Sequence, residues 1–197
     1  MKRESSYNWL FWIVVLCFTT SVISQEKEIP QTSESSINEE KVIQTLTISK
    51  YLQFNEEYST FVKVLKESDV FSHLESDKKF TVFAPGNSAF AQMPANVIDE
   101  LFRKENHVKL KSIAEYHIVN SILNLNEELF KLNGSTNIVA MNNEIIQITV
   151  GAEDRILIQD ANNYPIDVME KIELSNGIIY RIDAVLLPQV DVRMVLR

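Results

Sequence analysis

The stretch TVFAPGNSAF, residues 81–90, joins an apolar run to a turn and then to a second short apolar segment. The run Phe80–Ala84 predicts a buried strand, because it is compact, apolar and closed by a turn signal. The dipeptide Pro85-Gly86 provides that signal, since proline fixes its own φ and glycine frees the turn. Asn87 is expected to cap a short helix, and Phe90 on that helix is expected to reach the core. The stretch therefore predicts a structural corner between a strand and a helix.

Helical spacing flanks this corner on both sides. Residues 41–52 favour a first helix, although threonines interrupt its apolar face. Residues 58–65 predict a firmer one, because their apolar positions recur at i, i+3, i+4 and i+7. Ser68 is expected to cap a short successor, and Asn106 a helix that ends near residue 117. Further helices are expected from Pro94 and from Asn126.

After Gly134 the apolar period changes from helical spacing to two. This alternation predicts strands at residues 138–141, 145–150, 156–159, 166–174 and 178–187. Asn176-Gly177 predicts a hairpin with a type I′ turn, which needs positive φ at both central residues. Helices first and a meandering sheet last indicate an α+β domain.

Three segments in register resemble the fasciclin domain of secreted and cell-surface adhesion proteins: residues 81–90, residues 110–119 (LKSIAEYHIV) and residues 176–188 (NGIIYRIDAVLLP). The resemblance covers about residues 41–188. It implies N-terminal helices packed on a C-terminal, mostly antiparallel β-sheet. It also implies structural roles for a set of motif residues, which are Thr81, Phe83, Pro85, Asn87, Phe90, Asn176, Gly177 and Asp183.

The pair Tyr116-His117 carries the functional part of this resemblance. In the family a Tyr-His motif is associated with adhesion, which implies that the pair contacts a partner. The apolar residues around it favour a second interpretation, in which a buried histidine only links elements by a hydrogen bond.

The chain departs from the family pattern at three places. Gly86 stands where threonine is usual, and Tyr180 stands where histidine is usual. Lys171-Ile172 replaces an Asp-Ile step linked to integrin binding, so recognition of an integrin through this step is not expected.

The N-terminus has the features of a secretory signal. Lys2 and Arg3 precede the uncharged run 9–23, and a polar segment follows at once. Residues 1–24 are therefore predicted to be a signal peptide cleaved after Ser24. An uncleaved membrane anchor is the alternative, although the run is shorter than the roughly twenty residues of a span. The single cysteine, Cys17, lies in this run, where simple burial is favoured over a lipid-attachment site.

The rest of the chain divides into a flexible acidic spacer at 25–40, the domain at 41–190 and a tail at 191–197. The chain of 197 residues has a net charge of −8, which argues against binding nucleic acid. Asn133 begins an N-glycosylation sequon, which has meaning only in a eukaryotic source.

Catalytic patterns are not found in the sequence. No Gly-x-Ser-x-Gly motif is present, and the three histidines (His73, His107 and His117) do not have the spacing of zinc ligands. We therefore expect no catalytic residue, no metal site and no cofactor. The predicted function is that of a secreted or periplasmic, non-enzymatic domain mediating adhesion or matrix contact with a protein or glycan. The alternative is a periplasmic module that binds a small molecule or glycan in a pocket at the junction of helices and sheet.

Overall fold

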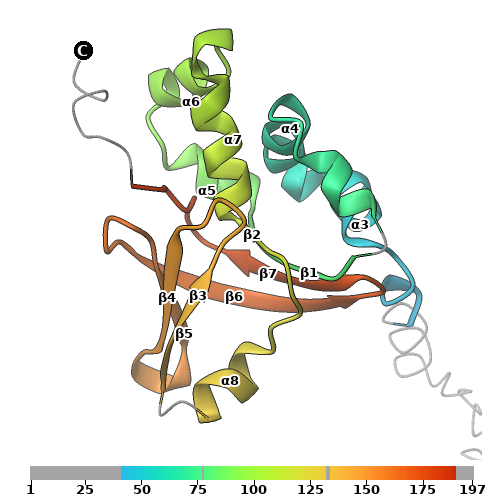
Figure 1. Cartoon of the computed structure of the whole chain (residues 1–197), viewed down its shortest axis with the longest axis vertical. Helices are drawn as coiled ribbons and strands as arrows, with labels where there is room; N and C mark the ends of the chain where they lie inside the picture. The colour runs from blue at the N-terminus through green and yellow to red at the C-terminus, as the bar shows by residue number, and fades with distance from the viewer. Residues whose placement is uncertain (1–40, 77, 132–133, 190–197) are drawn as a thin grey trace, which may run out of the picture. The chain divides into compact units, whose positions relative to one another are not determined.

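The computed structural model describes residues 41–189 except 77 and 132–133 (Figure 1). The predicted signal peptide, the acidic spacer and the 191–197 tail lie outside the described residues, as does Asn133. All statements below concern the described part of the chain.

Helices and short 3-10 turns form most of the first half of the domain. Their order, with the first strand and a two-residue strand among them, is α3 (Ile48–Phe54), η1 (Glu56–Tyr58), α4 (Ser59–Glu67), η2 (Phe71–Glu75), β1 (Phe80–Pro85), α5 (Asn87–Ala91), α6 (Ala95–Leu101), η3 (Lys104–Asn106), α7 (His107–Tyr116), β2 (Ile118–Val119) and α8 (Leu125–Lys131). The helix expected over 41–52 is interrupted, and Thr47 starts α3 by accepting a hydrogen bond from the Lys50 amide.

The remaining strands follow in sequence as β3 (Ser135–Val139), β4 (Ile145–Val150), β5 (Ile156–Gln159), β6 (Pro165–Leu174) and β7 (Gly177–Ile182), with the 3-10 turn η4 (Ala152–Asp154) before β5. The sheet order is β2-β1-β7-β6-β5-β4-β3. All neighbours are antiparallel except β1 and β7, which run parallel. The α+β class and the mostly antiparallel sheet are confirmed.

The sheet curls back on itself. Beyond the end of β3, the Met141 amide donates to the Ile118 carbonyl of β2 at 2.7 Å. This bond links the two ends of the strand order, so the sheet forms a wedge with an interior and an outer side (Figure 1).

Two hydrophobic cores result from this shape. One lies between the helices and the sheet, and it includes Phe61, Leu65 and Ile179. The other lies inside the wedge, and it includes Phe83 and Tyr180. Strand β7 contributes to both cores, which explains why it is apolar on both faces instead of alternating.

The predicted cap at Asn87 is wrong, because Asn87 is the first residue of α5 and its side chain leaves that helix. Its Oδ1 accepts from the Thr60 amide at 3.0 Å, and its Nδ2 donates to the Glu56 carbonyl at 2.9 Å. Helix α4 has no capping side chain from its own N-cap residue, Tyr58. The Asn87 side chain therefore caps the N-terminus of α4, although it belongs to a helix that comes later in the chain.

The side chains of Ser68 and Asn106 do not make the predicted N-cap hydrogen bonds, for a common reason. The Ser68 hydroxyl donates backward to the Leu65 carbonyl at 3.1 Å, at the end of α4. Asn106 is the N-cap residue of α7, as predicted, but its side-chain amide makes no cap bond and donates backward to the Glu100 carbonyl. Short polar side chains bond to local carbonyls as well as to local amides, so sequence position alone does not distinguish a start from an end.

The β6–β7 hairpin is confirmed, but its turn differs from the prediction. Leu174 pairs with Gly177, so the loop residues are Ser175 and Asn176, and neither has positive φ. The turn is therefore not type I′. Gly177 is required by close approach, since a Cβ there would lie 1.9 Å from the Phe80 carbonyl oxygen. Strand β7 also ends at Ile182, earlier than the predicted residue 187.

Candidate functional site

His117 lies between α7 and β2 and is completely buried. Its Nε2 accepts a hydrogen bond from the Leu186 amide at 3.0 Å. Because an amide can only donate, the ring proton must be on Nδ1, which donates to the Ile113 carbonyl at 2.7 Å. Both ring nitrogens are thus used to join α7 to the segment after β7.

The His117 ring is held in its neutral form. Burial lowers its pKa to about 4, with a smaller opposing effect of the bond to Ile113. The ring also packs against Phe61 of α4, with 5.3 Å between the ring centroids. At neutral pH His117 is therefore a neutral core residue.

Tyr116 is equally buried. Its hydroxyl donates to the Ile145 carbonyl at the start of β4, at 2.9 Å. Burial raises its pKa above the ordinary value for a tyrosine. Neither member of the Tyr-His pair is exposed, so a partner could contact these side chains only if the core opened. The geometry supports the interpretation in which the pair links elements internally.

Thr81 and Tyr180 together hold the segment between β2 and α8. The Thr81 hydroxyl donates to the Ser121 carbonyl at 2.7 Å and accepts from the Leu123 amide at 2.9 Å. The Tyr180 hydroxyl donates to the Leu123 carbonyl and accepts from the Leu125 amide, both at 3.0 Å. Tyr180, the departure from the family pattern, therefore makes two hydrogen bonds in the core.

Asn176 ties together three segments that are far apart in the sequence. Its Oδ1 accepts from the Ile48 amide at 2.7 Å, and its Nδ2 donates to the Leu74 carbonyl at 3.2 Å. Its own carbonyl accepts from the Phe80 amide at 3.1 Å. The side chain is buried, and both of its polar atoms have a hydrogen-bond partner.

The remaining motif residues also have contacts within the domain. Phe83 stacks on Tyr180, with 5.9 Å between ring centroids, and Phe90 is buried in the helical core. Pro85 pairs with Ile182 at the end of the parallel ladder. Asp183 directly follows β7, and its carboxylate accepts from the Asp167 amide of β6 at 2.8 Å.

Asp160 was not identified from the sequence. It is buried, and its Oδ1 accepts from the Asn162 and Tyr164 amides at 2.9 and 3.0 Å. Its Oδ2 accepts from the Leu187 amide at 3.4 Å. Its place at the start of an Asn-rich turn is the sequence signal by which it could have been identified.

The Lys171-Ile172 step lies on β6. Ile172 is buried, while the Lys171 ammonium lies 2.6 Å from a Glu173 carboxylate oxygen and donates to the Asn124 side chain at 3.3 Å. The hydrogen bond to Glu173 raises the pKa of Lys171. The positive charge of Lys171 is therefore already paired within the domain.

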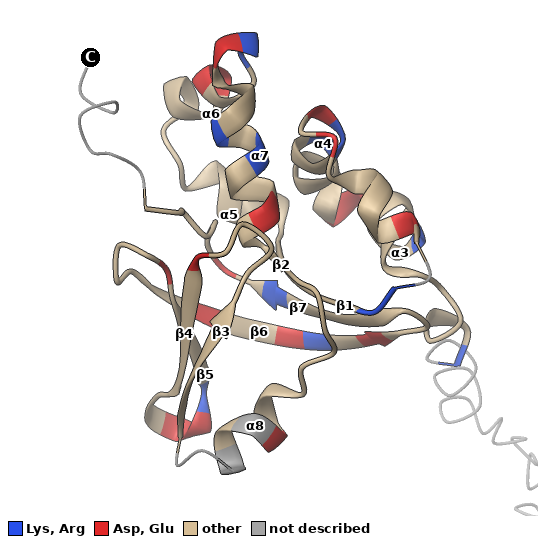
Figure 2. Cartoon of the chain, in the orientation of Figure 1, with Lys and Arg blue, Asp and Glu red and all other residues tan. Residues whose placement is uncertain are grey.

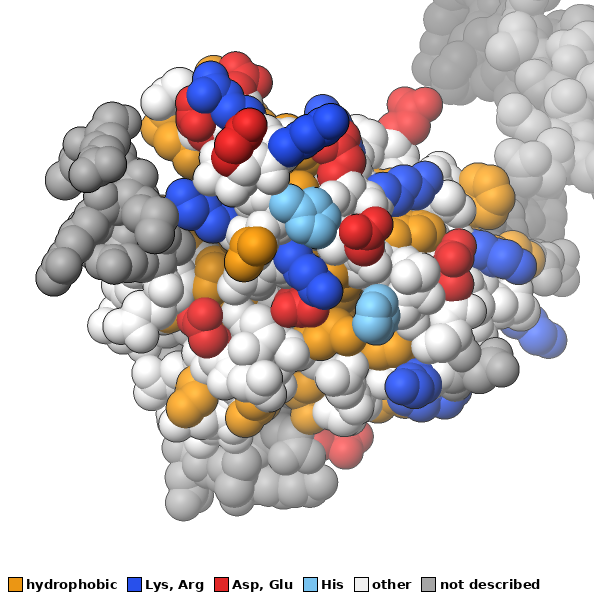
Figure 3. Space-filling model, turned by 45° about the horizontal axis from the view of Figure 1, so that its top comes forward, with side chains coloured by type: hydrophobic (Ala, Val, Ile, Leu, Met, Phe, Trp, Pro, Cys, Tyr) orange, Lys and Arg blue, Asp and Glu red, His pale blue; other side chains and the backbone are white. Residues whose placement is uncertain are grey.

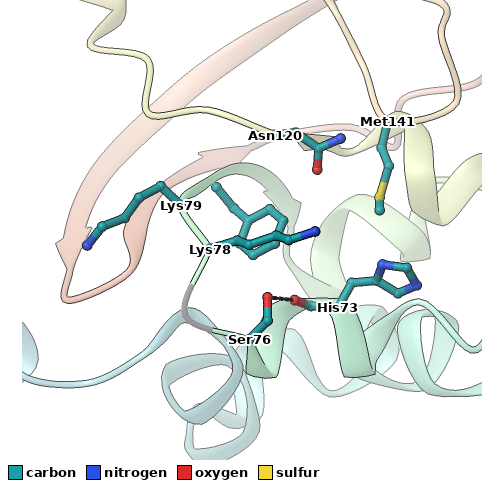
Figure 4. A pocket seen from close by; sticks show the side chains of 7 residues that line it. His73, Ser76, Lys78, Lys79, Asn120 and Met141 are labelled. Carbon is teal, nitrogen blue, oxygen red and sulfur yellow. Dashed lines mark hydrogen bonds between the residues drawn. The ribbon is translucent and has the colours of Figure 1, made fainter.

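A hollow of about 750 Å³ opens beside η2, β1 and the end of β2. Figure 4 shows that the Lys78 ammonium, the His73 ring and the Asn120 amide surround it, whereas Lys79 points away. Lys79 donates to the Ser175 carbonyl at 2.8 Å. Among the described residues that line the hollow, Lys78 and Lys79 carry charge, whereas Phe80 and Met141 are apolar.

The outer side of β3, β4 and β5 has a different character. The side chains that point outward there, called the outer face below, are those of Ser135, Asn137, Val139, Ile145, Gln147, Thr149, Leu157 and Gln159. No residue of these three strands is charged, although 23% of the chain is. Figure 2 shows the strands free of charge along most of their length. Val139 and Ile145 are cross-strand neighbours, and each is 58% exposed.

The helical side contrasts with the outer face. Figure 3 looks onto that side, where side chains of both charges alternate with small apolar areas. Ion pairs such as Arg103–Glu100 at 2.9 Å contribute to this pattern. A mixed, charged surface of this kind is typical of a solvated face.

The described residues provide neither a metal-ion cluster nor a membrane-spanning helix. They contain no group of three or more His, Cys, Asp or Glu side chains placed to hold a metal ion. Among the same residues, none of the helices has the length and apolarity that crossing a membrane requires.

Comparison with known proteins identifies the class. The family model of the fasciclin domain matches residues 56–188, which is most of the chain. The fold agrees, because the chain superposes with a TM-score of 0.63 on a solved FAS1 domain pair from the insect cell adhesion molecule Fasciclin I. That match has 25% sequence identity and covers 73% of this chain and 51% of the solved one. The chain belongs to the fasciclin-domain family.

Two relatives differ in how much of their own length this chain covers. The chain is 31% identical over 160 residues to Protein sll1483 of Synechocystis sp., covering 80% of this chain and 83% of that protein. It is 34% identical over 134 residues to Stabilin-2 of Mus musculus, covering 66% of this chain but only 5% of Stabilin-2. The similarity to Stabilin-2 is thus that of one small part of a much larger protein.

Proposed function

We propose that this protein is a secreted, non-enzymatic fasciclin-domain protein that contacts a protein or glycan partner at a cell surface or in a matrix. The description of Fasciclin I as a cell adhesion molecule and the membership of this chain in the same family support the proposal. The proposed location outside the cytoplasm rests on the predicted signal peptide at residues 1–24.

The outer face is the observation that carries the proposal. Contact surfaces differ from the rest of a protein surface by the depletion of charge at their centre. The outer face meets this criterion over three adjacent strands, and it exposes Val139 and Ile145 beside each other. Its neutral polar members, such as Gln147, provide side-chain donors and acceptors that suit a protein backbone or a glycan hydroxyl.

The buried titratable groups support a non-enzymatic role. His117, Tyr116 and Tyr180 each satisfy their polar atoms with backbone groups inside the domain. A general acid or base must come within hydrogen-bond distance of the substrate proton that it transfers. These three side chains are buried, so a substrate does not reach them.

The proposal is tested by binding of the full chain to three probes: intact cells, a matrix preparation and a bacterial envelope preparation. Contact through an uncharged face should persist as salt is raised, because screening weakens only interactions between charges. No binding to any of the three, or binding that disappears at high salt, would contradict the proposal.

A pair of charge-matched variants locates the contact. Gln147→Lys places a cation in the centre of the outer face and is expected to reduce binding tenfold or more, a loss of about 1.4 kcal/mol. Asn96→Lys adds the same charge at an exposed position of α6 and should leave binding unchanged. Equal effects of the two substitutions would show that the outer face is not the contact surface.

The hollow beside Lys78 favours a second candidate function, binding of a small acidic molecule or acidic glycan. Its polar groups come from η2, from the segment before β1 and from the segment after β2, as a junction of helices and sheet provides. A ligand bound only by the native state raises the melting temperature. We therefore expect neutral monosaccharides to have no effect and glucuronic acid to stabilise the chain, but not the Lys78→Gln variant. Lys50→Gln, on exposed α3 surface, is the matched control.

A further inference from the structure

Side chains, and not a strand ladder, hold most of the chain that follows β7. Residues 183–189, called the C-terminal strap below, come directly after β7 and are drawn in dark red in Figure 1. The strap begins on backbone bonds, because the Asp183 amide donates to the Asp167 carbonyl of β6 at 3.2 Å. Beyond Asp183, no backbone group of residues 184–189 bonds to the backbone of another described residue. This part of the strap therefore depends on the side chains that contact it.

The side chains that accept the strap's amides are all able to gain a proton. The three bonds run from the Leu186 amide to His117 Nε2 at 3.0 Å, from the Leu187 amide to Asp160 Oδ2 at 3.4 Å, and from the Gln189 amide to Glu144 Oε2 at 2.8 Å. Residue 188 is proline, which has no amide hydrogen to donate. Every amide of residues 186–189 is thus bonded to a titratable group.

The strap covers both hydrophobic cores. Val185 is buried in the core between the helices and the sheet, and Leu186 is completely buried in the core inside the wedge. Tyr116 and Ile158 belong to that same inner core. If the strap moves away, Leu186 leaves the inner core, and the end of the wedge where it lies loses its cover.

His117 cannot keep its bond to the strap once it gains a second proton. The proton on Nδ1 is already donated to Ile113, so a second proton must go to Nε2. Nε2 would then be a donor that faces the Leu186 amide, which is also a donor. The ring would in addition carry a charge in the core, which is costly without water or a counter-ion. Departure of the strap removes both costs, because the strap provides the group that faces Nε2.

The two carboxylates respond to acid in the same direction. Hydrogen bonds to an ionised acceptor are stronger than those to a neutral one, so protonation of Asp160 or Glu144 weakens its bond to the strap. Three further charged groups adjoin the beginning of the strap, where Arg155 pairs with Asp167 at 3.4 Å and the Asp183 carboxylate accepts from the Asp167 amide. The backbone bond of Asp183 does not involve a charge, so the beginning of the strap stays attached in acid.

We propose that the C-terminal strap is a latch that acid releases, in which protonation of its three acceptors frees residues 184–189 while the helices and the sheet stay folded. Residue 183 remains bound to β6 and acts as the hinge. The open form exposes Leu186 and the inner core beside Tyr116, which a partner cannot reach in the closed form. The inference is independent of the proposed function, because it concerns the strap and not the outer face.

The contribution of His117 to this release follows from two pKa values. Burial holds the pKa of the ring at about 4 in the closed form, whereas the pKa of an exposed histidine is about 6.5. Between these values the open form binds a proton and the closed form does not, so opening is favoured as the pH falls. From pH 7 to pH 5 the equilibrium constant for opening should rise about twentyfold.

Hydrogen exchange of the full chain, followed by mass spectrometry at pH 7 and pH 5, tests the latch. After correction for the intrinsic effect of pH on exchange, the protection of the strap amides should fall about twentyfold. Local opening exposes little surface, so exchange in the strap should not respond to low concentrations of urea, whereas exchange in β1 should accelerate. Strap exchange that follows that of β1 at both pH values and at every urea concentration overturns the inference.

Variants of the acceptors test the cause of the release. Glu144→Gln removes a charge but keeps an oxygen at its place, so exchange in the strap should accelerate about fivefold at pH 7. Glu105→Gln, at an exposed position of η3, is the matched control and should exchange like the parent. His117→Gln should lose most of the difference between pH 7 and pH 5. The latch is also overturned if His117→Gln keeps the full difference, or if Glu144→Gln and Asp160→Asn both leave exchange in the strap unchanged.

Discussion

Acid should destabilise this domain through His117, whose buried ring is neutral in the folded state. The ring is neutral in the folded state with a pKa of about 4, against about 6.5 for an exposed histidine. The unfolded chain therefore binds a proton in a pH range where the folded chain does not. The contribution of this group to stability is complete above pH 6.5 and is lost as the pH falls toward 4.

The size of the effect follows from the two pKa values. Linkage gives a loss of about 2 kcal/mol between pH 7 and pH 5, and about 3 kcal/mol by pH 4. A domain with 5–15 kcal/mol of stability would lose a large part of it over this range. The assay is urea denaturation followed by circular dichroism at intervals of half a pH unit.

His117→Gln is the variant that isolates the cause. It should cost about 1–3 kcal/mol at pH 7, because a hydrogen bond to Ile113 or Leu186 is lost in the core. However, its stability should change much less between pH 7 and pH 5 than that of the parent, since the glutamine at position 117 binds no proton there. The control His73→Gln, at an exposed position, should retain the parent's dependence of stability on pH. If the stability of His117→Gln fell with pH as steeply as that of the parent, the attribution of the pH dependence to His117 would be refuted.

Three other substitutions test the contacts that fix the domain, each by urea denaturation. Asn176→Ala should cost about 2–4 kcal/mol, because it removes two buried side-chain bonds that join α3, η2 and the hairpin, whereas Asn96→Ala on exposed α6 should be nearly neutral. Gly177→Ala should lower the free energy of unfolding by more than about 3 kcal/mol or prevent folding, since its Cβ would meet the Phe80 carbonyl. Its control is Gly134→Ala, where φ is positive but a Cβ would have no atom within 4 Å, and the expected loss is about 1 kcal/mol. Tyr180→Phe should cost about 1–2 kcal/mol and speed hydrogen exchange at the Leu125 amide; unchanged exchange there would contradict the role given to its hydroxyl.

Local patterns were sufficient to predict most elements of the fold. The alternation in 145–150 and 156–159 predicted β4 and β5 with their observed bounds, and the apolar run 80–84 predicted β1. Strand β2 could not be predicted, because a two-residue strand has no period. Nor could the parallel pairing of β1 with β7, which joins residues about a hundred positions apart.

The candidate site shows where sequence reasoning ends. Asn87 was recognised as a capping residue, but the helix that it caps precedes it by almost thirty residues and is brought near only by the fold. Tyr116 and His117 were recognised as a pair, but whether they face a partner or the core depends on the segments of Ile145 and Leu186. The neutral outer face could not be predicted without the strand register, because it consists of alternate residues of three strands.

One binding comparison tests most directly the claim that the contact surface is the outer face and not the Tyr-His pair. It measures at neutral pH the binding of the parent, Tyr116→Phe and Gln147→Lys to a preparation that captures the parent chain. Tyr116→Phe removes one buried hydroxyl and should bind like the parent, while Gln147→Lys, folded normally, should bind tenfold more weakly or worse. Normal binding by Gln147→Lys together with a loss of binding by a folded Tyr116→Phe would contradict the account.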